Sequence, residues 1–160
     1  MKILVCSDSH GDYARLFRAH EAAAPVDLTI HLGDGTEDAR LLEEVMETPV
    51  VRVPGNCDHG STLPGDILLN LEGVRVFATH GNRYGVKGGL SCLLARGAEV
   101  GAGVVLYGHT HIPSIRREGS ILLLNPGPLA GLGSYALLTL GGPPPHAELF
   151  TLPHPGTGSA

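Results

Sequence analysis

The chain has 160 residues, which is most simply one folded domain with a substantial core. Its formal net charge is −5 and it has no cluster of Lys and Arg, which argues against stable binding of nucleic acid through a basic face. The three cysteines form no CxxC pair, and the N-terminus lacks the apolar run of about 7–15 residues typical of a signal peptide. We therefore expect a cytoplasmic protein without a membrane segment.

The first half of the chain alternates predicted strands with predicted helices. Short apolar runs predict the strands, and apolar residues at helical spacing predict the helices, the second of which Thr36 can cap. The strands are expected over 2–7, 27–32 and 50–53, and the helices over 12–23 and 36–46. This β-α-β-α-β order predicts parallel strands joined by right-handed crossovers.

The second half is predicted to be richer in antiparallel strands. Strand pairs are expected over 66–71 with 73–79, 113–117 with 120–124, and 134–140 with 146–150, and between them a helix over 88–97 and a strand over 103–107. Two packed sheets with helices outside them would accommodate both halves in one domain over 1–150. The remaining residues, 151–160, are a tail rich in Pro and Gly.

Five short motifs place polar side chains where predicted strands end. They are Asp8-x-His10, Gly33-Asp34, Gly55-Asn56, His80-Gly81 and Gly108-His109-Thr110-His111. Because ligands of open α/β sheets collect beyond the carboxyl ends of the strands, we expect these side chains on one edge of a single sheet. Any one motif alone is typical of a solvated loop or a turn. It is their joint order after five apolar runs that favours a binding site.

The residue types in these motifs favour two divalent metal ions. Carboxylate and amide oxygens together with imidazole nitrogens suit Mn, Fe, Zn, Ni or Co better than Ca or Mg. Asp34 has two oxygens and can bridge two ions, and Asn56 offers a neutral carbonyl oxygen. The expected cofactor is therefore a pair of transition metal ions, for which manganese is the favoured identity.

The order D-x-H, GD, GN, HG, GHTH resembles the calcineurin-like metallophosphoesterase superfamily, and the small size and GNCD tetrad resemble its short YfcE-type branch. The resemblance runs from Met1 to about Phe150 and implies a four-layer α/β/β/α sandwich of two mixed sheets. It also implies that two metal ions share Asp34. One ion would be held by Asp8, His10, Asp34 and His111, and the other by Asp34, Asn56, His80 and His109.

This resemblance implies a hydrolase for small phosphoesters, most simply a phosphodiesterase. Two cations about 3.5–4 Å apart can activate a bridging hydroxide for in-line attack on phosphorus. Asp34, as the bridging ligand, and Asn56, as a donor to the phosphoryl oxygens, are the predicted catalytic residues. A phosphomonoesterase is an open alternative. So is a non-catalytic protein-binding scaffold that resembles the retromer subunit of the same fold, although a scaffold has no need for all seven ligands.

The tetrad Gly55-Asn56-Cys57-Asp58 departs from the family pattern, which often has a histidine as general acid where Cys57 stands. A thiol is a poor proton donor unless its pKa is adjusted. His59 is a candidate substitute, and it and Arg83 are the predicted substrate-binding residues. His31 is expected to be a hydrogen-bonded residue behind the ligands, and Asp38 a charge at a helix start. The oligomeric state is left open, with a homo-oligomer among the alternatives.

Overall fold

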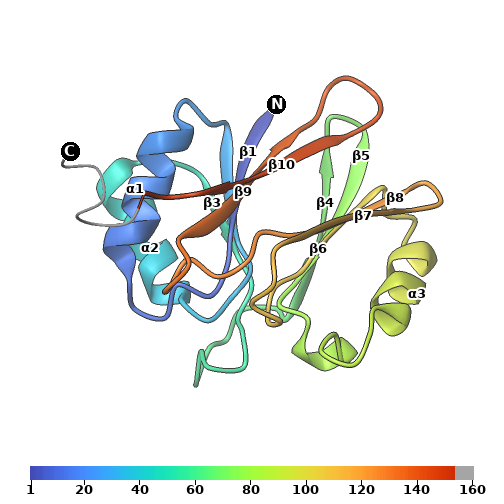
Figure 1. The fold of residues 1–160 in the computed structure, drawn as a ribbon, viewed down its shortest axis with the longest axis horizontal. Coiled ribbons are helices and arrows are strands. Elements are labelled where there is room, and N and C mark those ends of the chain that lie inside the picture. The colour runs from blue at the N-terminus through green and yellow to red at the C-terminus, as the bar shows by residue number, and fades with distance from the viewer. Residues whose placement is uncertain (154–160) are drawn as a thin grey trace.

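The computed structural model describes residues 1–153, and Figure 1 shows two sheets side by side with helices outside them. The strands and helices are β1 (Lys2–Cys6), α1 (Tyr13–Ala23), β2 (Leu28–His31), α2 (Thr36–Met46), β3 (Val50–Arg52), β4 (Asp66–Leu71), β5 (Val74–Thr79), the short 3-10 helix η1 (Asn82–Tyr84), α3 (Ser91–Glu99), β6 (Val104–Leu106), β7 (Ser114–Glu118), β8 (Ile121–Asn125), β9 (Ser134–Thr139) and β10 (His146–Thr151). Within residues 1–153, no helix is long and apolar enough to span a membrane.

Both sheets are mixed and have five strands each. The first has the order β10-β9-β1-β2-β3, in which β1, β2 and β3 are parallel neighbours. The second has the order β4-β5-β6-β8-β7, in which β5, β6 and β8 are parallel and both outer strands are antiparallel. The predicted two-sheet α/β architecture is therefore confirmed.

Side chains along each central strand alternate between the interior shared by the two sheets and the face covered by helices. In β1, Ile3 and Val5 face the interior between the two sheets, whereas Leu4 and Cys6 face α1 and α2. The second sheet repeats the pattern, since alternate residues of β5, β6 and β8 either join the same interior or pack under α3. Because successive side chains point to opposite faces, each central strand has two buried sides, which accounts for its almost continuous apolar sequence.

Two expectations need correction. The five motifs do not lie on a single sheet, because the strands before Asp8, Asp34 and Asn56 belong to the first sheet and those before His80 and His109 belong to the second. The physical reason is that the strands of both sheets end at the same side of the shared interior. Thr36 also does not cap α2, whose N-cap is Gly35 without a side-chain cap. A smaller shift concerns the helix expected over 88–97, which begins three residues later and ends two residues later, at Ser91–Glu99.

Because side chains are packed between the two sheets, shortening one of these side chains should lower the stability of the protein. Leu106 on the central strand β6 is fully buried there, whereas Leu68 on the edge strand β4 is 46% exposed. Replacing Leu106 by Ala should lower the free energy of unfolding by about 2–5 kcal/mol, because it leaves a cavity between two rigid layers. The matched change Leu68→Ala should cost less than about 1 kcal/mol. Urea denaturation measures both, and equal losses would contradict tight packing between the sheets.

Candidate metal centre

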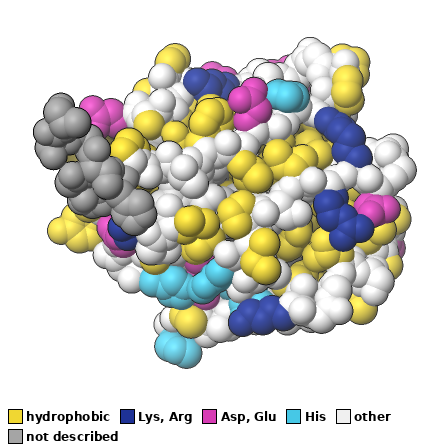
Figure 2. Space-filling view, in the orientation of Figure 1, with side chains coloured by type: hydrophobic (Ala, Val, Ile, Leu, Met, Phe, Trp, Pro, Cys, Tyr) yellow, Lys and Arg dark blue, Asp and Glu magenta, His cyan; other side chains and the backbone are white. Residues whose placement is uncertain are grey.

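The loops after β1, β2, β5 and β6 meet where the two sheets end. Backbone hydrogen bonds tie the first two loops together, from Asp8 N–H to the Gly33 carbonyl (2.9 Å) and from His10 N–H to the Asp34 carbonyl (2.9 Å). The loop after β6 joins them, since His109 N–H donates to the Asp8 carboxylate at 3.3 Å. Histidine side chains accordingly gather on one face of the molecule (Figure 2). Residues from both sheets are thereby brought into one site.

Two groups of metal-binding atoms form within this site. Asp8, His10 and His111 make the first, with His111 Nε2 3.1 Å and His10 Nε2 3.7 Å from Asp8 Oδ1. The second comprises Asp34, His80 and His109. These groups contain three of the four ligands predicted for each ion. The Asp34 carboxylate lies between them, because its Oδ2 is 4.0 Å from His10 Nε2 and 3.3 Å from His80 Nε2.

His80 shows why the second group suits a cation. Its Nδ1 lies 2.7 Å from the Leu32 carbonyl, which can only accept, so Nδ1 carries a proton that it donates. In the neutral ring, Nε2 is then an acceptor, yet it faces Asn56 Oδ1 at 3.0 Å and Asp34 Oδ2 at 3.3 Å. His109 Nδ1 is also close, at 3.2 Å. Lone pairs that converge in this way need a proton or a metal ion between them.

Charge and burial support the same interpretation. The side chains of Asp8 and Asp34 are 1% and 3% exposed, and within residues 1–153 no lysine or arginine forms an ion pair with either. Burial opposes ionisation of Asp34, but hydrogen bonds from His80 and Cys57 N–H outweigh it and lower the pKa of Asp34. The pKa of His80 is raised, because the neighbouring Asp34 and Asp8 carboxylates outweigh its burial. The protein thus holds buried negative charge that a divalent cation can neutralise.

The backbone is strained at most of the candidate ligands. Among residues 1–153, seven residues other than glycine have a positive φ, and five of them are candidate ligands: Asp8, His10, Asp34, His109 and His111. Side chains with a Cβ rarely adopt this left-handed conformation, and such strain persists only where the surrounding structure imposes it. Strain at five of the seven predicted ligands therefore indicates a functional site.

Asp58 holds the loops that carry Asp34 and Asn56, a role that the sequence did not reveal. One carboxylate oxygen accepts the N–H groups of Gly35 (3.0 Å) and Thr36 (3.2 Å), and the other accepts those of Asp34 (2.7 Å) and Gly55 (2.8 Å). This contact supplies the N-terminal cap of α2 that Thr36 was expected to provide. Its only sequence signal is the acidic residue that closes the GNCD tetrad, and the tetrad does not reveal which backbone groups it binds.

The close approach of the Asp34 carboxylate explains why position 55 is a glycine. A Cβ on Gly55 would lie 2.1 Å from Asp34 Oδ1, the oxygen that accepts the Cys57 N–H at 2.8 Å. Any side chain there would therefore displace the carboxylate that is predicted to bridge the ions.

A second polar network orients the loop that carries His10. His31 is fully buried, accepts the Gly33 N–H at its Nδ1 (3.1 Å) and lies 3.0 Å from Ser9 Oγ through its Nε2. The Ser9 hydroxyl donates to Asp38 (2.6 Å), which also accepts the Gly11 N–H. Burial lowers the pKa of His31 to about 4, so the ring is neutral at pH 7 and its Nε2–H donates to Ser9. Asp38 is thus at a helix start, as expected, but it also supports the loop.

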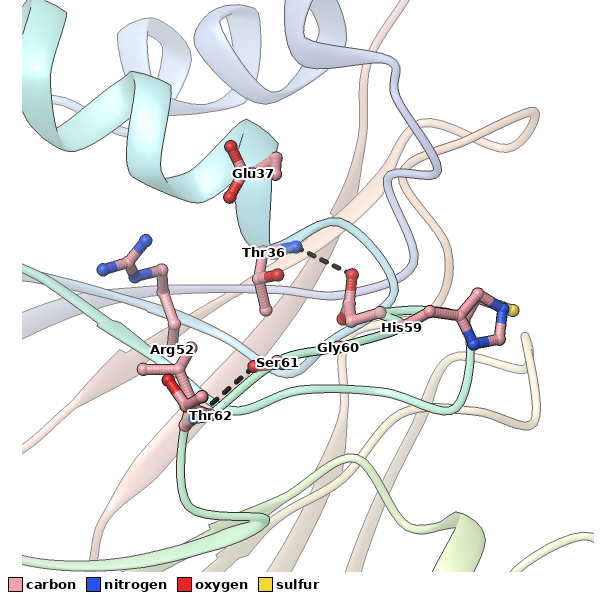
Figure 3. A pocket seen from close by; sticks show the side chains of 10 residues that line it. Thr36, Glu37, Arg52, His59, Gly60, Ser61 and Thr62 are labelled. Atoms are coloured by element: carbon pink, nitrogen blue, oxygen red, sulfur yellow. Dashed lines mark hydrogen bonds between the residues drawn. The ribbon is translucent and has the colours of Figure 1, made fainter.

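The predicted substrate-binding residues, His59 and Arg83, line two different cavities. His59 lines a cavity of about 580 Å³, in which its ring points away from Thr36 and Arg52 (Figure 3). Arg83 lines a separate cavity of about 210 Å³ together with Asn56. Cys57 Sγ belongs to a third possible ligand group, with His10 and Asp34. Although Cys57 is exposed, local desolvation and the carboxylates of Asp34 and Asp58 raise the pKa of its thiol, which makes it a weaker acid.

Asp58 acts as a clamp, because it accepts four backbone N–H groups from two loops. We therefore expect the protein to lose more stability when Asp58 is replaced than when Asp27 is replaced. Replacing Asp58 by Asn turns an NH₂ group towards backbone N–H donors, and the free energy of unfolding should fall by about 1–3 kcal/mol. The control is Asp27→Asn, because Asp27 accepts a single exposed N–H, that of Lys2 at 2.7 Å, and its loss should be below about 1 kcal/mol. Urea denaturation in the presence of a chelator measures the stability of the protein alone. Similar losses for both variants would show that Asp58 does not act as a clamp.

A family profile and individual relatives both relate this chain to phosphoesterases. The profile of the calcineurin-like phosphoesterase superfamily domain matches residues 1–141. The probable metallophosphoesterase YsnB of Bacillus subtilis is 35% identical over 88% of this chain and 85% of its own length. Phosphodiesterase YfcE of Escherichia coli K12 is 31% identical over 79% of this chain and 78% of its own.

Solved structures agree in fold. A predicted phosphoesterase from Streptococcus pneumoniae TIGR4 superposes with a TM-score of 0.82 at 29% identity and covers 97% of this chain and 93% of its own. Vps29 of Entamoeba histolytica, crystallised with Zn²⁺, gives a TM-score of 0.76 at 18% identity over 94% of this chain and 98% of its own, which is a likeness of fold alone. With the superfamily profile covering most of its length, the chain belongs to the calcineurin-like phosphoesterase superfamily.

Proposed function

We propose that this protein is a metal-dependent phosphodiesterase that hydrolyses small phosphodiesters at a dinuclear centre. The observation that carries the proposal is the convergence of acceptor atoms from both sheets into two groups, each of which contains a buried carboxylate, with the Asp34 carboxylate between them. Within residues 1–153, no Lys or Arg forms an ion pair that would neutralise the Asp8 and Asp34 carboxylates of these groups. Their need for a cation matches the family to which the chain belongs.

The proposed ligand sets divide the seven residues between two ions. Asp8, His10, Asp34 and His111 would hold one, and Asp34, Asn56, His80 and His109 the other. Mixed oxygen and nitrogen donors favour Mn, Ni, Fe, Co or Zn, and manganese is our choice among them. Bound divalent ions supply an acidified water and polarise the phosphoryl oxygens.

The protein's own groups orient the ligands. The Leu32 carbonyl holds His80 in the tautomer whose Nε2 faces the centre. The Ser7 hydroxyl donates to Asp8 Oδ2 at 2.5 Å, which leaves Oδ1 towards His111 and His10. Asn56 is the proposed donor to a phosphoryl oxygen, and Arg83, which shares a cavity with Asn56, would pair with the phosphate. Preorganised groups of this kind reduce the cost of positioning substrate.

Diesters are preferred over monoesters for two reasons. The candidate ligands His10 and His111 are exposed, so the site is open to the extended ester groups of a diester. In addition, its relative YfcE is named a phosphodiesterase. The substrate is proposed to be small, because the net charge of −5 disfavours long nucleic acid. A cytoplasmic location is proposed as well, consistent with three free cysteines.

A non-catalytic scaffold is the rival with specific support, because the Vps29 structure shares the fold. Two observations weigh against it. A protein-binding surface does not require buried carboxylates without a counter-charge, which are costly to keep. Nor does it require five candidate ligands in a strained backbone conformation.

Metal dependence is the first test of the proposed function. Metal-stripped protein should be inactive, and Mn²⁺ should restore hydrolysis of bis(p-nitrophenyl) phosphate more than of p-nitrophenyl phosphate. Asp34→Asn should lower kcat/KM more than about 100-fold, because it weakens the ligand that both ions share. The control His59→Gln should cost less than about tenfold. A loss of about 100-fold for His59→Gln would instead identify it as the general acid, and absence of turnover with Mn²⁺ or Ni²⁺ would contradict the enzyme.

The leaving group provides a second test. Because the pKa of the Cys57 thiol is raised, we propose that protonation of the leaving group is weakly assisted. Rates for a series of aryl methyl phosphodiesters should then fall steeply as the pKa of the leaving phenol rises. A shallow dependence would mean that a general acid is present.

A further inference from the structure

An apolar cavity lies beside the candidate metal centre, and the chemistry above leaves it unused. Its volume is about 240 Å³. Buried Tyr107 and Val86 contribute to its lining, and Ile112 forms a wall that is 66% exposed. Two exposed basic residues, Lys87 and Arg116, also line the cavity, and because Arg116 pairs with the Glu118 carboxylate, Lys87 supplies the positive charge of the rim.

The walls of this cavity continue directly from candidate metal ligands. One wall, residues 86–90, follows His80 after η1, and the other contains Thr110 and Ile112, which flank His111. Hydrogen bonds fix the second wall, since Asn125 Nδ2 donates to Thr110 Oγ1 (2.9 Å) and Ile112 N–H donates to the same oxygen (3.2 Å). In Figure 2, hydrophobic side chains lie next to the histidine cluster on the same face. A ligand at the metal centre would therefore lie within reach of the cavity.

Lys87 places positive charge at the rim of the cavity. Its side chain is exposed and lines the same cavity as Thr110 and Ile112, which flank the candidate ligand His111. Within residues 1–153, Lys87 forms no ion pair. An anionic phosphate oxygen would complement this charge.

We propose that the cavity binds a ring-sized apolar ester group of the phosphodiester substrate while Lys87 pairs with a phosphate oxygen. This inference rests on the proposed function. Drug-sized ligands occupy pockets of about 300–1,000 Å³, so this cavity is suited to a single ring. Such a group would cover the exposed Ile112 and contact the Tyr107 ring. The substrate class is therefore phosphodiesters in which one ester group is a ring-sized apolar group, in preference to esters with small alkyl groups.

The test compares two phosphonates on Mn²⁺-loaded full-length protein. Isothermal titration calorimetry should give a Kd for phenylphosphonate about tenfold below that for methylphosphonate, because its phenyl ring is transferred from water into the apolar cavity. Ile112→Ser should reduce this ratio to about twofold or less, and Leu90→Ala, in the same cavity, should reduce it too. The matched control Val45→Ser, at an exposed residue of α2, should leave it unchanged. Lys87→Gln should weaken both phosphonates by up to about fivefold, whereas Lys2→Gln should not.

Hydrolysis of bis(p-nitrophenyl) phosphate on the same preparation separates the two proposals. Metal-dependent hydrolysis with equal Kd values for the phosphonates would overturn the cavity assignment alone. So would a tenfold preference that Ile112→Ser and Leu90→Ala leave intact, because the ring would then bind elsewhere. Absence of metal-dependent hydrolysis would overturn the proposed function and, with it, this inference.

Discussion

The site depends on one electrostatic constraint, which is that hydrogen-bond acceptors converge around His80 while no Lys or Arg within residues 1–153 forms an ion pair with the Asp8 or Asp34 carboxylate. His80 Nε2 lies at the centre, 3.0 Å from Asn56 Oδ1 and 3.3 Å from Asp34 Oδ2. Without a metal ion, protons on the histidines offset the repulsion, which accounts for the raised pKa of His80 and the lowered pKa of Asp34. Metal binding must therefore displace protons.

The two-sheet core makes this convergence possible. Strands of both sheets end at the same side of one shared apolar interior, so five loops from distant parts of the chain meet there. Asp58 and the His31–Ser9–Asp38 network then hold three of these loops, those after β1, β2 and β3, by hydrogen bonds to the backbone. Rigid layers and satisfied polar groups together maintain the positive φ values at the candidate ligands.

Much of this arrangement was predictable from local patterns. Apolar runs located the strands, and a polar residue after each run located the candidate ligands, because both features are local in the sequence. The distribution of strands between two sheets was not predictable in the same way, since it depends on pairings such as β6 with β8 that no short motif encodes. Asp58 was missed as a clamp for the same reason, because its partners at Gly35 and Thr36 are more than twenty residues away.

Anomalous diffraction from crystals grown with Mn²⁺ would test the dinuclear centre most directly. We predict two manganese peaks, one contacted by Asp8, His10 and His111 and the other by Asn56, His80 and His109, with Asp34 contacting both. A single peak at saturating Mn²⁺, or two peaks of which Asp34 contacts neither, would contradict a centre built around a shared carboxylate.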